Sequence, residues 1–402
     1  MSDFALTRRP RLALPAIAAT GLLLGALVVG SAFGVRLGAL MAVGGLLGMV
    51  LYHAAFGFTA AWRVFITERR GRGLRAQMVM LAIAVVLFFP ALSAGSLFGQ
   101  SVYGFVAPIG VSVVVGAFLF GLGMQLGGGC ASGTLFTAGG GNARMLVTLL
   151  FFVVGSVIGT AHFTWWQSLP AFQPVSLVKS LGATGGIVVS LVLFAAIAGL
   201  TVVMERRRHG GLEQVSRIDA GNRRWLTGPW PLLFGAVALA LLNFATLSLA
   251  GRPWGVTSAF ALWGAKGFEF LGGDVSQWGY WQFSWNANAL EASVWGDITT
   301  VMNVGIMVGA FIAASLAGKF APNLRIPARS LLAAVIGGVL LGYGARLAFG
   351  CNIGAYFGGI ASGSLHGWVW LVAAFAGNML GVKLRPFFFE GQAARLPAAK
   401  GC

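Results

Sequence analysis

Residues 121–133 read Gly-Leu-Gly-Met-Gln-Leu-Gly-Gly-Gly-Cys-Ala-Ser-Gly, and residues 342–354 read Gly-Tyr-Gly-Ala-Arg-Leu-Ala-Phe-Gly-Cys-Asn-Ile-Gly. The two stretches share the pattern G-x-G-x-[QR]-L-x-x-G-C-x-x-G. Each shared residue recurs after 221 positions, from Gly121 to Gly342 and from Cys130 to Cys351. Self-similarity at a fixed spacing is typical of a duplicated unit. The chain is therefore predicted to hold two copies of one unit, each with a cysteine at a glycine-rich break in an apolar run.

The composition places the chain in a membrane. Of its 402 residues, 57% are hydrophobic and only 9% are charged, whereas soluble domains carry about 25% charged residues. The 61 glycines favour close helix packing and broken helices. The net charge of +17 is explained by basic residues in short loops, so no nucleic-acid partner is expected.

The apolar pattern predicts an all-α polytopic membrane protein with about ten transmembrane helices. The predicted spans lie near residues 12–33, 37–52, 76–97, 104–124, 143–167, 182–204, 230–250, 298–317, 330–348 and 367–384. Four further stretches are too short or too rich in glycine to span, and we interpret them as re-entrant half-helices. They lie near residues 53–66, 127–139, 253–268 and 350–364. Irregular backbone is tolerated at membrane depth only where it is buried in protein or lines a polar cavity.

Basic residues indicate the orientation, because cytoplasmic loops are enriched in Lys and Arg. The ten predicted spans put five groups of basic residues on one side: Arg8, Arg9 and Arg11; Arg69, Arg70, Arg72 and Arg75; Arg206, Arg207, Arg208, Arg217, Arg223 and Arg224; Lys319, Arg325 and Arg329; and Lys383 and Arg385. Both termini and a loop at 205–228 are then cytoplasmic. The aromatic loop at 269–296 is periplasmic, as an interfacial belt or a lid over an outer mouth.

Five spans and two re-entrant segments in each half give the halves opposite orientations. We therefore predict two inverted repeats, residues 1–175 with the Cys130 motif and residues 176–402 with the Cys351 motif. In such transporters, sites lie near the midplane where broken helices meet. A weaker repeat supports this arrangement, because Phe56-Gly-Phe-Thr-Ala-Ala-Trp62 parallels Trp254-Gly-Val-Thr-Ser-Ala-Phe260.

The cysteine motifs are predicted to form the substrate path. A half-helix aims unpaired N–H groups and positive dipole charge beyond its N-terminus, which favours an anion. Glycines before the helix allow close approach of the backbone. The residues assigned to the path are the cysteines, the flanking donors and glycines, and the matching positions of the weaker repeat: Cys130, Cys351, Gly128, Gly129, Ala131, Ser132, Gly133, Gly350, Asn352, Ile353, Gly354, Gly57, Gly255, Thr257, Gln125 and Arg346.

The two cysteines indicate which class of anion the path would carry. A thiolate would repel an anion, so we interpret each cysteine as a neutral, soft S–H donor, which favours a polarizable sulfur-containing anion over phosphate. The alternative is that each is a small buried hydrophobe. No C-x-x-C, P-loop or histidine cluster occurs, so no redox pair, ATPase, metal site or cofactor is predicted, and no catalytic residues are assigned.

Two charged positions each allow two interpretations. Arg346 replaces Gln125 of the first motif at the outer end of its span. It either snorkels to the interface or draws anions into an outer mouth. Glu269 follows Lys266 by three residues, so a local ion pair is expected, with a proton-relay role as the alternative.

These segments resemble the YeeE/YedE family of bacterial inner-membrane proteins, members of which take up thiosulfate. The matching segments are 121–136, 253–257 with 261–266, and 344–357. The resemblance implies an hourglass-shaped transporter of inverted repeats with cysteines along a narrow central path, here Cys130 and Cys351. Family members often carry a third cysteine in a Phe-Cys-Phe-like stretch, where this chain has Gly57.

The sequence therefore predicts an inner-membrane transporter, not an enzyme, that takes up thiosulfate or a related sulfur anion. Another sulfur or selenium species is an alternative substrate. The alternative from a different class is a membrane sulfurtransferase or redox component that relays persulfide between Cys130 and Cys351. The predicted partners are the anion, the lipid bilayer and a small cytoplasmic sulfur-carrier protein.

Overall fold

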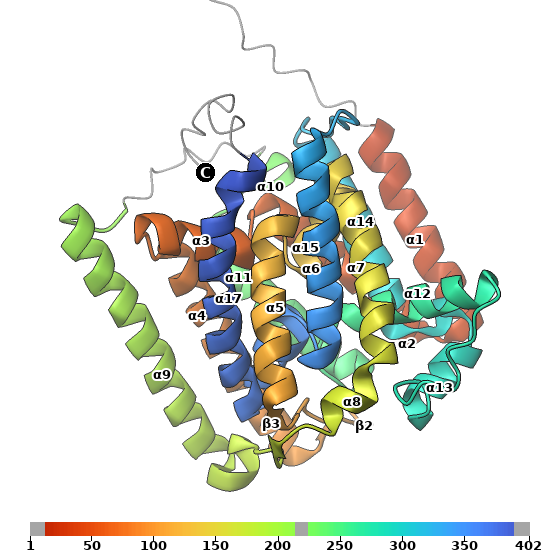
Figure 1. The fold of residues 1–402 in the computed structure, drawn as a ribbon, viewed down its shortest axis with the longest axis horizontal. Coiled ribbons are helices and arrows are strands. Elements are labelled where there is room, and N and C mark those ends of the chain that lie inside the picture. The colour runs from red at the N-terminus through yellow and green to blue at the C-terminus, as the bar shows by residue number, and fades with distance from the viewer. Residues whose placement is uncertain (1–12, 214–223, 390–402) are drawn as a thin grey trace, which may run out of the picture.

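The computed structural model describes residues 13–213 and 224–389, and within them the chain is a multi-pass helical membrane protein (Figure 1). Ten helical segments there are long and apolar enough to cross a membrane, as predicted. Their long helices are α1 (Ala13–Phe33), α2 (Val35–His53), α4 (Arg72–Ala94), α5 (Val111–Gly127), α7 (Ala143–Ala161), α9 (Leu177–His209), α11 (Leu232–Ala250), α14 (Ile298–Leu316), α15 (Ala328–Leu347) and α17 (Leu365–Phe389).

Short helices fall where the sequence predicted segments that do not span. They are α3 (Phe58–Glu68), α6 (Ala131–Gly139), α12 (Thr257–Phe270), and the π-helix η2 (Asn352–Phe357) continued by α16 (Gly358–Ala361). Strand is confined to two small pairs: β1 (Ser96–Leu97) with β2 (Gln100–Ser101), and β3 (Ile109–Gly110) with β4 (Ala171–Phe172). Connecting helices complete the described chain: α8 (Phe163–Gln167), α10 (Arg224–Thr227), α13 (Ser284–Glu291) and the 3-10 helix η1 (Val294–Gly296).

Several predicted boundaries were wrong. The span predicted at 104–124 starts later, because β3 occupies residues 109–110 and α5 begins at Val111. The span predicted at 143–167 is two helices, α7 and α8. The loop predicted from residue 205 begins at Gly210, because α9 continues to His209 and ends at a left-handed glycine. Residues 214–223 of that loop, and Arg8, Arg9 and Arg11, lie outside the described residues.

Glycine seams explain the unusual composition. The helices α5 and α15 cross in contact, and a Cβ at Gly123 would lie 2.9 Å from the carbonyl oxygen of Gly337. A Cβ at Gly344 would likewise lie 2.5 Å from the carbonyl oxygen of Gly116. Small residues let apolar helices approach closely enough for backbone packing in a membrane. Substitution at these seams would separate the helices that carry the two cysteine motifs.

Helix contacts occur in matched pairs when the halves are compared in chain order. The helix α2 packs on α14, and α4 packs on α11. Similarly, α7 packs on α15 and α5 packs on α17, while α5 and α15 pack on each other. In chain order α2 corresponds to α11, α4 to α14, α5 to α15 and α7 to α17. Replacing each helix by its counterpart turns the α2–α14 contact into the α11–α4 contact, and the α7–α15 contact into the α17–α5 contact. The inverted relation between the halves stays a prediction, and this exchange is what it requires.

One end of the molecule gathers the basic loops. In Figure 1, α9 and α17 end, and α1 begins, at the same end. There the buried carboxylate of Glu205 accepts hydrogen bonds from Arg75 Nη1 at 2.8 Å and from the backbone N–H of Gly71 at 3.0 Å. It also accepts one from the N–H of Glu213 at 2.9 Å. The α3–α4 turn and the end of α9 are therefore joined, as two loops on one side of a membrane can be.

The segment between α12 and α14 is folded and packed. Trp281 is 3% exposed and packs in a separate hydrophobic cluster with Ala261, Leu262, Ala265, Val275 and Leu290. The predicted Lys266–Glu269 pair is wrong, because Lys266 Nζ donates to the carbonyl oxygen of Leu290 at 2.6 Å. Glu269 takes part in none of the ion pairs of the described residues. Lys266 thus ties α12 to α13.

Candidate functional site

The first cysteine motif forms a sharp junction between two helices. The helix α5 ends at Gly127, and Gly128 adopts a left-handed conformation with φ 88° while its N–H donates to the carbonyl oxygen of Met124. Cys130 then occupies the N-cap position of α6. The predicted helix start directly after this cysteine is confirmed.

The second motif repeats this geometry with different side chains. Phe349 stands 221 residues after Gly128 and is also left-handed, with φ 58°, and Gly350 follows with φ 146°. A left-handed phenylalanine is rare and stores backbone strain of order 1–3 kcal/mol. Cys351 is the N-cap residue of η2, and Tyr356 N–H donates back to its carbonyl oxygen at 3.2 Å. π-Helical turns of this kind are frequent at functional sites.

Each sulfur accepts a hydrogen bond from its own helix. Gly133 N–H donates to Cys130 Sγ at 3.4 Å, and Ile353 N–H donates to Cys351 Sγ at 3.4 Å. Cys130 Sγ also lies 3.5 Å from Ser132 Oγ. Both thiols are buried, at 2% and 0% exposure. One N–H of each helix start is thus directed at sulfur, and neither of these two bonds uses the thiol hydrogen.

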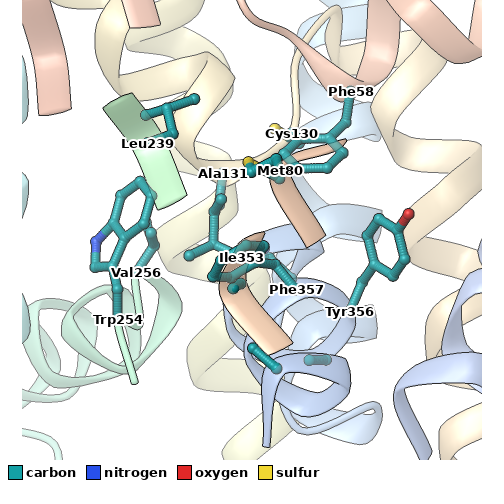
Figure 2. Packing of buried hydrophobic residues seen from close by; sticks show 14 of the residues in the cluster. Phe58, Met80, Cys130, Ala131, Leu239, Trp254, Val256, Ile353, Tyr356 and Phe357 are labelled. Atoms are coloured by element: carbon teal, nitrogen blue, oxygen red, sulfur yellow. The ribbon is translucent and has the colours of Figure 1, made fainter. Parts of the chain in front are cut away.

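The two motifs meet in the core. The helix α6 packs on η2, and Figure 2 shows Cys130 and Ala131 of α6 with Ile353 and Phe357 of η2 beyond Ala131. Phe58 of α3 packs against Tyr356 of η2, with ring centroids 5.8 Å apart, and the neighbours of Phe58, Gly57 and Thr59, line one cavity with Cys130. Segments from three distant parts of the chain therefore meet near the first thiol.

A cavity of about 330 Å³ lies against the first motif. Five residues predicted for the path line it: Gly57, Gly128, Gly129, Cys130 and Gly133. The rest of its lining is Tyr52, Ala55, Thr59, Ala60, Phe136, Thr137 and Lys319. Cys351 does not line this cavity and is fully buried. The structure thus brings five of the eight predicted residues of the first half to one recess, whereas Ala131, Ser132, Gln125 and the predicted residues of the second half do not line it.

Three predicted path glycines face open space. A Cβ built at Gly57, Gly255 or Gly354 meets no atom within 4 Å. These glycines are therefore not required by packing in this conformation. The YeeE/YedE resemblance predicts a cysteine at the position of Gly57, and the space beside Gly57 could hold such a side chain.

Gln125 and Arg346 occupy matching positions but have different surroundings. Gln125 is fully buried, and its Nε2 donates to the carbonyl oxygen of Thr59 at 3.1 Å and to Asn378 Oδ1 at 2.6 Å. Arg346 is 6% exposed and donates from Nη1 to the Tyr280 hydroxyl at 2.8 Å. The Tyr280 hydroxyl of the segment between α12 and α14 thus covers the Arg346 guanidinium, and both interpretations of Arg346, snorkelling to the interface and drawing anions into an outer mouth, stay predictions.

Two further predicted residues are buried at helix starts. Thr257 is the first residue of α12 and is 4% exposed. Asn352 is fully buried at the start of η2, and neither polar atom of its amide has a hydrogen-bond partner in the described residues. A buried amide without partners is costly, and it marks the second helix start as a place where a ligand could supply them.

Sequence reasoning missed Thr59, Lys319 and Tyr280. Thr59 could have been found, because it is the counterpart of Thr257 in the weaker repeat. In the sequence Lys319 indicates only the topology, and its place at the cavity depends on the packing of α14 against α2 and α6. Tyr280 gave no sequence signal beyond the aromatic content of its loop.

Comparison with known proteins identifies the family. The profile of the sulphur transport family matches residues 53–380. The chain belongs to this family. The YeeE/YedE resemblance is thereby confirmed over most of the sequence.

Individual members of the sulphur transport family are similar over different lengths. The protein named "Thiosulfate transporter TsuA" of Spirochaeta thermophila is 29% identical over 84% of this chain and 95% of its own length. The "Thiosulfate transporter TsuA" of Escherichia coli is 28% identical over 83% of this chain and 90% of its own. The "Probable transporter YedE" of Escherichia coli is 34% identical over 41% of this chain, and the match spans only 40% of that relative.

Proposed function

We propose that this protein takes up thiosulfate, or a related sulfur-containing anion, along a path lined by Cys130 and Cys351. One observation carries the proposal: two cysteine-capped helix starts, repeated at a fixed spacing, meet in the core of a sulphur transport family member. The similarity to two proteins named thiosulfate transporters, over more than four fifths of the chain, supports the same substrate class.

The proposed architecture is two inverted repeats, residues 1–175 and 176–402, whose short helices enter the membrane without crossing it. The exchange of helix contacts between the halves supports it. A pair of re-entrant helices from opposite sides would bring the positive ends of α6 and η2 toward one midplane site. The glycine junctions before them leave room for an anion near the backbone.

The proposed step is passage, not a covalent reaction. The anion exchanges water for the N–H groups at the two helix starts and for soft S–H donors, because each sulfur already accepts from Gly133 or Ile353. No bond to sulfur forms or breaks, so the protein is not an enzyme. Gln125 positions α3 beside the first thiol through Thr59 and Asn378.

The proposed location is the bacterial inner membrane, with both termini cytoplasmic. A membrane potential of ~100 mV, negative inside, opposes entry of a dianion by roughly 4.6 kcal/mol, at ~2.3 kcal/mol per charge. Uptake therefore requires rapid intracellular consumption of the anion or coupling to protons or sodium. A small cytoplasmic sulfur-carrier protein is a fitting partner at the inner mouth, because it would remove the product.

The test is uptake of radiolabelled thiosulfate by purified protein in liposomes, with and without an ionophore. We expect intact label inside the vesicles with no partner protein present, and inhibition by an inside-negative potential. Absence of uptake under an inward gradient, by protein shown to be folded, would refute the transport function.

A further inference from the structure

Four side chains with polar groups outside the predicted path line the cavity beside Cys130: Tyr52, Thr59, Thr137 and Lys319. Two of these groups suit an anion, the Thr59 hydroxyl, which is buried without a partner in the described residues, and the Lys319 ammonium, which carries a full charge. We propose that these two groups form an oxygen-binding subsite for the transported anion, next to the Cys130 thiol. The inference rests on the proposed transport of a sulfur oxyanion and names the residues that hold its oxygen end.

The hydroxyl of Thr59 is a buried hydrogen-bond donor that a ligand could use. It is 5% exposed, and its hydroxyl has no hydrogen-bond partner within the described residues. A buried polar group without a partner costs roughly 1–3 kcal/mol. Its backbone is nevertheless held in place, because Thr59 O accepts from Gln125, which is itself bonded to Asn378. A fixed backbone with a free hydroxyl at a cavity wall is suited to a ligand that arrives and leaves.

Two helix starts meet at this same cavity. Its lining includes Thr59 and Ala60 from the first turn of α3 and Gly133 from the first turn of α6. The first N–H groups of a helix lack intrahelical partners and carry positive partial charge. The threonine hydroxyl therefore lies where two such ends favour negative charge, which is the setting for an oxyanion.

Lys319 adds a full positive charge to the partial charges of the two helix starts. It is the one charged side chain among the described residues that line the cavity, and it forms none of their ion pairs. It follows the end of α14 and is exposed, so it stands at the mouth that basic residues predict to be cytoplasmic. An exposed ammonium attracts anions at low ionic strength and loses that effect as salt screens it.

The arrangement implies one orientation of the anion. Thiosulfate has a soft terminal sulfur and three hard oxygens. The soft end suits the Cys130 thiol, whereas the oxygens suit the Thr59 hydroxyl and the Lys319 ammonium. Sulfate offers only oxygens. It should therefore compete at this site through Thr59 and Lys319, without dependence on Cys130.

The experiment compares matched variants in the full-length protein. Thr59→Val removes the hydroxyl at nearly constant volume, and Thr59→Ser keeps it. Thr246→Val is the control, because that buried hydroxyl bonds within α11 to Leu242 O at 2.9 Å, away from the cavity. Binding is read as thermal stabilisation of detergent-solubilised protein by thiosulfate, and transport as uptake into liposomes.

For the charge, Lys319→Gln and Lys319→Arg are compared with Lys383→Gln. Lys383 is an exposed lysine on α17 that does not line the cavity. All variants are measured at ~10 mM and ~1 M ionic strength, where the Debye length is about 30 Å and 3 Å.

We expect Thr59→Val to raise the apparent Kd and KM for thiosulfate about tenfold or more, with Thr59→Ser and Thr246→Val near the parent. Lys319→Gln should weaken binding by about fivefold at low salt and lose that effect at high salt, whereas Lys319→Arg and Lys383→Gln stay near the parent. Parental affinity in both Thr59→Val and Lys319→Gln would overturn the subsite. A parent that binds thiosulfate through Thr59 but does not carry it would refute the transport function and keep the subsite. A parent that neither binds nor carries thiosulfate would refute both.

Discussion

Gly350→Ala tests the backbone geometry at the second helix start. Gly350 has φ 146°, outside the regions that residues with a side chain adopt, and its Cβ would lie 2.9 Å from the backbone nitrogen of Ala355. The conformational strain is of order 1–3 kcal/mol, and forcing the η2 backbone aside costs a further ~1–3 kcal/mol. We therefore expect a loss of about 2–6 kcal/mol of stability.

The matched control is Gly354→Ala, four residues further along the same turn. A Cβ there meets no atom within 4 Å, so the folded protein should keep its stability. Uptake should fall nonetheless, because in the proposed path the added methyl group projects toward the anion. The pair thus separates a glycine required by backbone geometry from one required by the substrate.

The assay is thermal unfolding followed with a thiol-reactive dye, on a Cys402→Ser background. Cys130 and Cys351 are buried at 2% and 0% exposure, so the dye reports their release on unfolding. At about 2.1 cal/mol/K of unfolding entropy per residue over 402 residues, Gly350→Ala should lower the midpoint by about 2–7 °C. Equal midpoints for Gly350→Ala and Gly354→Ala would refute the geometry described for this turn.

Three further predictions concern other parts of the molecule. Gly211→Cys should react with an impermeant thiol reagent only from the cytoplasmic side, and Ser276→Cys only from outside, because the basic loops define the inner face; labelling of Gly211→Cys in intact cells would contradict the topology. Gly57→Cys should fold like the parent, because its Cβ meets no atom within 4 Å. The new thiol should also react with a small thiol reagent that enters the cavity. Failure of this variant to fold would contradict the open space beside Gly57. Glu205→Gln should destabilise the protein by about 2 kcal/mol or more, because it leaves Arg75 and the Gly71 N–H without their charged acceptor. An unchanged unfolding midpoint would show that these hydrogen bonds of Glu205 do not stabilise the fold.

Local patterns predicted much of the fold. Apolar runs located ten spans, since the bilayer fixes the length of a crossing helix. The repeated motif located both helix starts, because glycine followed by a small capping residue is a local signal. Features that depend on a few neighbouring residues could be predicted from those residues alone.

Contacts between distant segments could not be predicted. Glu205 stands next to three arginines in the sequence, yet its partner Gly71 is 134 residues away, and that contact turns an expected loop residue into a buried anchor. Arg346 is covered by Tyr280, 66 residues away. Thr59 gained its importance from a cavity to which α2, α3, α6 and Lys319 all contribute. In each case the tertiary partner decides the role.

The proposed thiol-lined path is tested most directly by uptake of radiolabelled thiosulfate into liposomes that contain equal amounts of parent, Cys130→Ala or Cys351→Ala. Alanine keeps roughly the volume of the buried side chain and removes the S–H donor. The persulfide alternative is checked in the same samples by mass spectrometry of both cysteines during turnover. We predict uptake by the parent, loss of most uptake in each variant, and no persulfide on either cysteine. Uptake by Cys351→Ala at the rate of the parent would contradict the path proposed for this protein.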